Sequence, residues 1–282
     1  MAPSSTGVSS NAPLVAIRAR GLHTPLNLKE LWEYRDLFYF LTMRDIKVRY
    51  KQTALGAAWA VIQPLFATLT FALFFGRLAK LPSEGIPYPL YVYTAMTMWS
   101  FFANAITQGG NSLVSNANLI SKVYFPRLIV PAAAVAGGLL DFAISFVVLI
   151  GMLVYYRVPL HTSLSLMPIS LVLVLILGTA VGLWMSALNV KYRDVRYALP
   201  FLVQLWMFAT PIIYPPTIVP DRWRWLLSLN PMTGLIGTFR ASMFGLPADW
   251  VSLGLAAVIS TIAFLYASYS FRRMERHFAD VV

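Results

Sequence analysis

Long apolar segments recur along the 282-residue chain, and its charged residues gather between them. A helix needs about 20 mostly apolar residues to cross the hydrocarbon core of a bilayer. Six segments come near this length, the fifth being the shortest; they run from Ala54 to Phe75, Leu90 to Ile106, Ile129 to Tyr155, Leu164 to Leu188, Leu199 to Ile213 and Trp250 to Phe271. The sequence therefore predicts an all-α integral membrane protein whose residues 52–282 form six transmembrane helices.

The composition agrees with a membrane protein, since 58% of the residues are hydrophobic and only 12% are charged. Cysteine is absent, which excludes disulfides and thiolate metal sites. The histidines His23, His161 and His277 are too scattered to predict a metal cluster. We therefore expect no bound metal.

The net charge of +11 follows membrane topology. Six basic residues fall in the segments predicted to lie outside the cell: Arg77, Lys80, Arg157, Arg222, Arg224 and Arg240. The other 16 of the 22 lie on the side of the N-terminus. This asymmetry is that of the positive-inside rule, so it predicts cytoplasmic N- and C-termini and gives no support to a nucleic-acid partner.

The N-terminal region divides into two parts. Residues 1–26 lack an apolar stretch and are predicted to be a mobile tail. Asn27 followed by Glu30 resembles a capping box, and apolar residues follow it at helical spacing. We predict an amphipathic helix over residues 27–51 at the cytoplasmic membrane surface, which either receives a partner or substrate or anchors the chain to lipid.

The second apolar segment carries a polar stripe, because six polar residues recur every three or four positions: Thr94, Thr97, Ser100, Asn104, Thr107 and Asn111. Polar groups in hydrocarbon need a partner. Hydrogen bonding to a neighbouring helix is the favoured explanation, and the lining of a hydrated path is the alternative.

The cytoplasmic segment from Ser115 to Pro131 mixes basic and large apolar residues, and it predicts a short amphipathic helix that ends at Pro126. Such an apolar patch favours a protein partner, while burial against the chain's own amphipathic helix is the competing interpretation.

Three further features bear on packing. Pro64 interrupts the first span, so a neighbouring helix must satisfy the carbonyl that it frees. Asp141 lies within the third span, where we expect it to pair with a polar or basic neighbour. Gly178 and Gly182 form a GxxxG pair that predicts close packing inside the chain.

Residues 211–247 form neither a full span nor a polar loop. Two short apolar stretches, Trp223 to Leu229 and Met232 to Phe244, are separated at Asn230-Pro231. The pattern predicts a pair of short re-entrant or interfacial helices at the outer face.

The chain resembles the membrane subunit of bacterial polysaccharide and polyol-phosphate exporters, within the ABC-2 type permeases. The resemblance rests on residues in a specific order: Leu55-Gly56, Trp59, Pro64, the run from Leu119 to Pro131, Asn189, Tyr192, Arg193, Asp194, Tyr214-Pro215, Asn230-Pro231 and Arg240. It implies a homodimer in the inner membrane that binds two cytoplasmic ATP-binding subunits.

This resemblance also implies where the motor docks. The chain has no GxxxxGK[ST] loop, so ATP and Mg are expected on the partner subunit, with no cofactor and no enzymatic activity on this chain. The implied coupling helix comprises Asn118, Leu119, Ile120, Lys122, Tyr124, Phe125 and Arg127. In it, Leu119, Ile120, Tyr124 and Phe125 are expected to be the apolar anchors on the ATPase, and Lys122 and Arg127 the charges at the rim of the contact. A second cytoplasmic contact comprises Lys191, Arg193, Asp194 and Arg196.

The implied substrate is a lipid-linked polysaccharide, with O antigen first and capsule or teichoic acid as variants. A sugar chain needs a hydrated path with aromatic and polar walls; the candidates are Tyr91, Thr97, Trp99, Ser100, Phe102, Asn104, Phe201, Trp206, Phe208 and Tyr214. We expect fewer than half of the aromatic candidates to line the path, with the others in the core or facing lipid. The basic residues Arg44, Lys47 and Arg49 are candidates for recruiting the lipid diphosphate.

Other functions fit less well. An ABC-2 drug or lipid exporter shares the architecture and is the main alternative. An ion-coupled secondary transporter needs several ionisable groups in the membrane, and Asp141 stands nearly alone there. A membrane enzyme needs clustered carboxylates or histidines, and the 11 acidic residues are dispersed.

Overall fold

The computed structural model describes residues 28–51, 56, 58–159 and 161–275, and all regular structure within them is helical. The predicted tail over residues 1–26 and the capping residue Asn27 lie outside this part. The helices are α1 (Leu28–Glu33), α2 (Arg35–Lys51), α3 (Ala58–Phe71) with its π-helical continuation η1 (Ala72–Leu78), α4 (Tyr88–Ser115), α5 (Ala117–Lys122), α6 (Ile129–Tyr155), η2 (Thr162–Leu166), α7 (Met167–Lys191), α8 (Val195–Phe208), η3 (Pro216–Ile218), α9 (Asp221–Leu229), α10 (Pro231–Phe244) and α11 (Trp250–Glu275).

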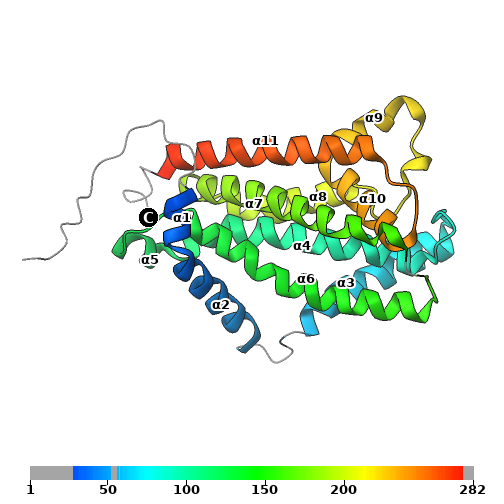
Figure 1. The fold of residues 1–282 in the computed structure, drawn as a ribbon, viewed down its shortest axis with the longest axis horizontal. Helices are drawn as coiled ribbons and strands as arrows, with labels where there is room; N and C mark the ends of the chain where they lie inside the picture. The colour runs from blue at the N-terminus through cyan, green and yellow to red at the C-terminus, as the bar shows by residue number, and fades with distance from the viewer. Residues whose placement is uncertain (1–27, 52–55, 57, 160, 276–282) are drawn as a thin grey trace, which may run out of the picture.

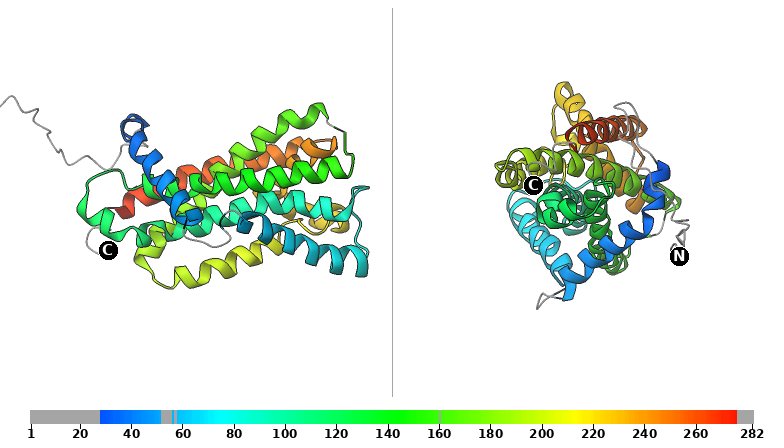
Figure 2. Two further views of the ribbon diagram at one scale, coloured as in Figure 1. Left: turned by 90° about the horizontal axis from the view of Figure 1, so that it is seen from below. Right: turned by 90° about the vertical axis from the view of Figure 1, so that its left-hand side faces the viewer.

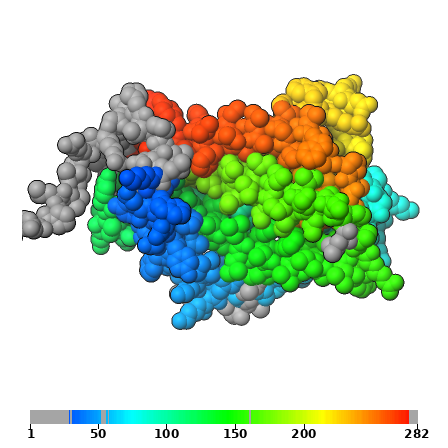
Figure 3. All heavy atoms as spheres, viewed as in Figure 1, coloured from blue at the N-terminus to red at the C-terminus, as the bar shows by residue number. Residues whose placement is uncertain are grey.

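The long helices α4, α6, α7 and α11 form an elongated bundle (Figures 1 and 2). Helices α1, α2 and α5 gather at one end of it, and α9 and α10 lie toward the other. We call these the α5 end and the α9 end. One long face of the bundle consists of α6, α7 and α11, with α2 lying across it near the α5 end (Figure 3).

Four helical segments of the described chain are long and apolar enough to cross a membrane: Ala58–Leu78, Ile129–Tyr155, Thr162–Lys191 and Trp250–Glu275. They coincide with the predicted first, third, fourth and sixth spans. The second predicted span corresponds to the 28-residue α4, which is long but more polar, and the fifth to the 14-residue α8, which is short. Length and composition thus support a multi-pass membrane protein, and the count of six spans stays a prediction.

Helix α4 lies at the centre of the bundle. Every side chain from Leu90 to Trp99 is buried. The predicted GxxxG pair of α7 lies against this helix, because a Cβ added at Gly182 would come within 3.0 Å of the Ala105 carbonyl oxygen, and one added at Gly178 within 2.9 Å of the Ala105 Cβ. The glycines therefore allow close packing inside one chain, as predicted.

The backbone defect at Pro64 is repaired by a neighbouring helix. Proline has no N–H to donate to the carbonyl four residues earlier, that of Ala60. The Ser145 hydroxyl of α6 donates to this carbonyl oxygen at 2.8 Å. This contact confirms the expectation for the first span and fixes α3 against α6.

The N-terminal amphipathic region differs from its prediction. It forms two helices, α1 and α2, with a turn at Tyr34, in place of one continuous helix over residues 27–51. Leu31 and Tyr34 pack against the same apolar cluster that buries Leu41 of α2. The turn thus lets apolar residues of both short helices reach one cluster at the α5 end.

Candidate functional site

The predicted coupling segment is helical only over α5, and its apolar residues divide into two sets. Ile120 and Phe125 are each only 4% exposed, in an apolar cluster with Leu41 of α2. The prediction that these two side chains are surface anchors needs correction, since they already fill the core between the coupling segment and α2. Burial against the chain's own amphipathic helix was the competing interpretation, and it holds for this pair.

The rest of the segment forms an exposed tip. Tyr124 is 78% exposed and Val123 is 53% exposed. Asn118 and Lys122 are also exposed, while Leu119 is half-buried. Exposed large apolar groups beside a lysine are suited to protein docking. The surface available to a partner is therefore centred on Tyr124.

Arg127 is engaged within the chain. Its backbone N–H donates to Glu275 Oε1 at 3.2 Å, and its Nη1 donates to the Glu275 carbonyl oxygen at 2.9 Å. Both contacts join the segment after α5 to the last residue of α11. The predicted role of Arg127 as a rim charge gives way to a structural one, because the guanidinium caps a helix C-terminus.

The predicted second contact lies at the turn between α7 and α8. Its four members are all exposed: Lys191, Arg193, Asp194 and Arg196. The Lys191 ammonium lies 5.0 Å from the ring centroid of Tyr192. This turn is a charged, solvent-facing surface.

The three basic residues proposed to recruit a lipid diphosphate have different surroundings. Arg44 donates to Asp45 Oδ1 and, at 2.8 Å, to Asn116 Oδ1 at the α4–α5 corner. Lys47 is exposed and lines a groove of about 220 Å³ on α2. Arg49 is bound to Asp141, as described below. Lys47 is thus the most accessible of the three.

The polar stripe of α4 is mostly satisfied within its own helix. The hydroxyls of Thr94, Thr97 and Thr107 each donate to the carbonyl four residues earlier, at 2.8–2.9 Å. Further along, Asn189 of α7 donates to Asn111 Oδ1 at 3.0 Å. Interhelical bonding, the favoured explanation, applies directly to Asn111.

Two members of the stripe have another environment. Ser100 and Asn104 are half-buried and form no hydrogen bond with any described residue. They line a small pocket between α3, α4 and α6, together with Gln63 and Asp141. These are the stripe residues that are open to a water molecule or a hydroxyl group.

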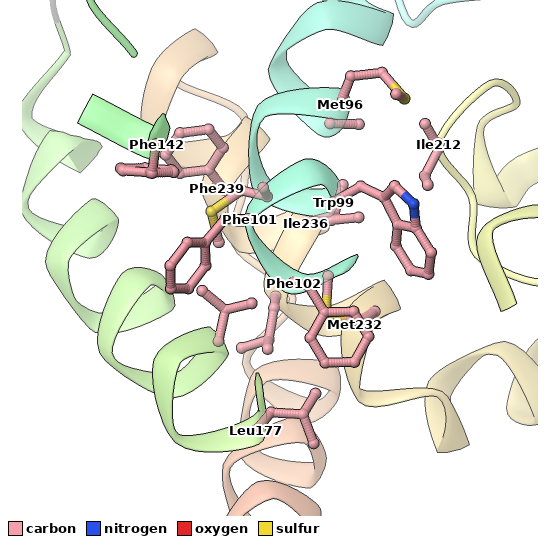
Figure 4. Packing of buried hydrophobic residues seen from close by; sticks show 14 of the residues in the cluster. Met96, Trp99, Phe101, Phe102, Phe142, Leu177, Ile212, Met232, Ile236 and Phe239 are labelled. Carbon is pink, nitrogen blue, oxygen red and sulfur yellow. The ribbon is translucent and has the colours of Figure 1, made fainter. Parts of the chain in front are cut away.

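The aromatic candidates for a path are split between core and surface. Tyr91, Trp99 and Phe102 are at most 3% exposed. The ring centroid of Phe102 lies 5.6 Å from that of Trp99 (Figure 4). It lies 5.0 Å from the ring centroid of Trp206. In this conformation Tyr91, Trp99 and Phe102 are packed core and do not line an open path, because tight packing of large rings leaves no room for a polymer.

The other aromatic candidates remain accessible. Phe201 is 63% exposed and Phe208 is 48% exposed, both on α8. Tyr214 is half-buried, and its hydroxyl donates to the Phe208 carbonyl oxygen at 3.4 Å. An outward-facing row on a short apolar helix can meet lipid, a second copy of the chain or a substrate.

At the α9 end, the predicted pair of short helices is present, and they meet at Asn230 and Pro231 as the sequence indicates. Asn230 caps α10 by accepting from the Met232 N–H at 3.1 Å. It also accepts from Trp206 Nε1 at 3.0 Å and donates to Thr210 Oγ1 at 2.9 Å. One asparagine thus joins α8, the following turn and α10.

Arg240 of α10 is a buried arginine whose environment the sequence did not indicate. Its guanidinium donates to the Tyr91 hydroxyl at 2.8 Å and to the carbonyls of Pro211 and Ile212 at 2.9 and 2.6 Å. It also lies 3.5 Å from the Tyr91 ring centroid. The sequence predicts a short re-entrant or interfacial helix here, on the outer side by charge counting, and the structure shows that Arg240 on this helix links three parts of the bundle. Its position inside an apolar stretch was the available signal.

Asp141 of α6 is paired, as expected. Its carboxylate accepts from Arg49 Nη1 and from the Tyr50 hydroxyl, both at the end of α2. Burial, together with the hydrogen bond to Asp141, raises the pKa of Tyr50. We call Arg49, Tyr50 and Asp141 the Asp141 cluster.

Comparison with known proteins gives a consistent result. The family model for ABC-2 type transporters matches residues 36–244. The chain is 28% identical over 260 residues to an O-antigen export system permease protein RfbA of Myxococcus xanthus, covering 90% of this chain and 98% of that protein. It is 26% identical over 250 residues to an RfbA of Klebsiella pneumoniae, covering 88% and 95%. It is also 21% identical over 244 residues to the polysialic acid transport protein KpsM of Escherichia coli, covering 83% and 92%.

Proposed function

Since the chain belongs to the ABC-2 type transporter family, we propose that it is the membrane subunit of an ATP-driven polysaccharide exporter, with a lipid-linked O antigen as its substrate. The observation that carries this proposal is the coverage of O-antigen permeases along nearly their whole length. A shared motif alone would support only the fold.

The proposed unit contains two copies of this chain and two ATP-binding subunits in the inner membrane. In this arrangement α4 and α8 complete six spans, the α5 end faces the cytoplasm and the α9 end faces outward. The exposed basic residues near α5, such as Lys122 and Arg193, are consistent with this orientation. ATP and Mg act on the partner subunit.

The path for the glycan is proposed to run beside α4 and α8. Phe201 and Phe208 on α8 offer aromatic faces, and Ser100 and Asn104 offer polar groups without a partner in the described chain. Trp99, Phe102 and Trp206 pack behind this surface in the present conformation. Lys47, with Arg44 beside it, is proposed to attract the lipid diphosphate at the groove on α2.

The proposed docking of the ATPase can be tested at the α5 tip with two adjacent aromatic residues. Tyr124→Asp changes an exposed side chain and is expected to lower export and ATPase stimulation while the protein amount stays normal. Phe125→Asp places a charge in the apolar cluster and is expected to lower the protein amount itself. Normal export by a well-inserted Tyr124→Asp variant would refute docking through this tip.

The substrate class can be tested in cells that lack the gene. We expect these cells to lack the polysaccharide on their surface and to retain the lipid-linked polymer inside. The wild-type chain should reverse both defects. A separate ATP-binding protein is expected to copurify with it. Export of a drug or a simple lipid with unchanged surface polysaccharide would instead support the alternative exporter class.

A further inference from the structure

The Asp141 cluster joins a helix of the α5 end to the interior of the bundle. Asp141 lies 12 residues beyond the first residue of α6, which places it about 18 Å along that helix at 1.5 Å per residue. Arg49 and Tyr50 reach it from the last turn of α2. The cluster is thus a polar contact between α2 and α6, in which Arg49 and Tyr50 are 92 and 91 residues from Asp141 in the sequence.

Helix α2 follows the first half of α6 through a series of contacts. Leu41 belongs to the apolar cluster that includes Ile129 at the start of α6. A Cβ at Gly137 would lie 3.9 Å from Ile46 Cγ1, an ordinary van der Waals distance. The series ends at Asp141. Packing along this length, with an ion pair at its far end, connects α2 to this half of α6.

The same α2 also holds the coupling segment. Arg44 donates to Asn116, the residue between α4 and α5, and the Asn116 side chain donates in turn to the Ser112 carbonyl oxygen at 2.8 Å. Ile120 and Phe125 pack in the cluster of Leu41. A displacement of α5 therefore acts on α2 through both a hydrogen bond and apolar contacts.

The connection from α5 through α2 ends at a polar pocket beside Asp141. Asp141 shares the pocket with Ser100 and Asn104 of α4 and with Gln63 of α3. A shift of α6 relative to α4 would change the exposure of these polar groups. They are the same groups that the proposed glycan path uses.

We propose that Arg49, Tyr50 and Asp141 are positioning residues that transmit movement of the coupling segment, through α2, to the middle of α6. This inference rests on the proposed function, because it requires an ATPase that moves α5. When the Asp141 cluster is removed, we expect ATP hydrolysis to continue without the accompanying movement of α6.

The test uses the absence of cysteine in the natural chain. A Ser100→Cys reporter is placed in the pocket, and the full complex with its ATPase is labelled with a water-soluble maleimide, with and without ATP and vanadate. We expect nucleotide to change the labelling rate by about tenfold, a size typical of coupling between sites. Asp141→Asn in the reporter background is expected to reduce that change below about twofold while ATP hydrolysis continues.

Two further variants exclude a merely structural effect. Asp36→Asn alters an exposed ion pair on the same helix and is expected to leave the nucleotide response unchanged. In the Asp141→Asn background without the reporter, Ile46→Cys with Gly137→Cys is expected to form a disulfide that replaces the lost contact. Oxidation should then restore transport per ATP, and reduction should abolish it again.

The outcomes separate the two levels of the proposal. An unchanged nucleotide response in Asp141→Asn, or a wild-type reporter that never responds, would overturn transmission through the cluster. Loss of ATP hydrolysis together with protein amount, without rescue by the disulfide, would reduce the cluster to a structural role and also overturn it. A responsive wild-type complex that moves no glycan would refute the proposed substrate and leave the transmission route standing.

Discussion

The structure accommodates the charges of two arginines in opposite ways: Arg49 is partly exposed on α2, and Arg240 is buried in α10. Arg49 is paired with a carboxylate, Asp141, on another helix. Arg240 forms no ion pair with a described carboxylate; it donates to the backbone carbonyls of Tyr91, Pro211 and Ile212 and to the Tyr91 hydroxyl. The first arrangement depends on side chains from two helices, whereas the second depends mainly on backbone dipoles and an aromatic face.

The contrast indicates different mechanical roles. A pair of side chains from two helices can separate when those helices move, and each charge can then find water or another partner. Backbone carbonyls at Pro211 and Ile212 cannot change identity, and the Arg240 side chain is only 4% exposed. We therefore expect the Arg240 site to be a fixed clamp at the α9 end and the Asp141 cluster to be an adjustable joint.

The largest expected effect follows from removing the clamp. Arg240→Met keeps much of the side-chain volume and leaves several buried acceptors without a donor, at a cost of about 3 kcal/mol or more in the free energy of unfolding. Thermal unfolding and membrane-inserted protein amount measure this loss. Arg222→Met, at an exposed position of α9, is the matched control and is expected to change little. Equal stability of the two variants would contradict the clamp.

Lysine substitution sharpens the comparison. Arg240→Lys is expected to lose about 2 kcal/mol, because an ammonium cannot reproduce the planar fork that reaches Pro211 and Ile212 together. Arg49→Lys retains a positive charge for Asp141 and is expected to lose less than about 1 kcal/mol. Both are compared by thermal unfolding. A smaller loss of stability for Arg240→Lys than for Arg49→Lys would contradict the assignment of Arg240 as the fixed clamp.

Removing one hydroxyl from each site gives a smaller effect. Tyr91→Phe keeps the ring beneath Arg240 and removes one acceptor, and Tyr50→Phe removes one donor to Asp141. Each is expected to cost about 1 kcal/mol in stability. Only Tyr50→Phe is expected to weaken the nucleotide response of the pocket reporter, which distinguishes the joint from the clamp in the same experiment.

The smallest effect concerns an exposed charge at the α9 end. Asp249 caps α11, accepting from the backbone N–H groups of Val251 and Ser252 and from the Ser252 hydroxyl. The Ser252 side-chain hydrogen bond, with the backbone donors, lowers the pKa of Asp249. Its ionised form therefore stabilises the fold above the pKa of the unfolded chain, and this contribution is lost as pH falls through the lowered folded value.

Thermal unfolding across pH tests this cap. Asp249→Ala is expected to lose about 1 kcal/mol at neutral pH, and Asp249→Asn less, since an amide still caps the helix. The advantage of wild type over Asp249→Asn should disappear in acid. A stability advantage of wild type over Asp249→Asn that grows as pH falls would contradict the ionised cap.

The sequence predicted the helices well wherever one periodic apolar pattern dominated. The four strongest apolar segments, the break at Asn230-Pro231 and the contact that repairs Pro64 all follow from local rules of length, turn chemistry and hydrogen bonding. The GxxxG pair also packed as expected, because small residues leave a groove that another helix must fill.

Predictions about exposure were weaker because they depend on which element lies opposite. Phe125 and Tyr124 are adjacent aromatics in one amphipathic segment, and only the position of α2 makes the first buried and the second exposed. Trp99 and Phe102 looked equally suited to a path or a core. Charge counting counts Arg240 only as an outer basic residue, because the carbonyls of Pro211 and Ile212 that accept from it come from another part of the chain.

The most direct test of the account is glycan transport by the wild-type chain reconstituted in vesicles with its copurified ATPase and a lipid-linked polysaccharide. We predict that ATP drives the polymer across the vesicle membrane and that Tyr124→Asp abolishes this movement while the chain remains inserted. ATP hydrolysis without movement of polymer, or equal movement without the ATPase, would contradict the account.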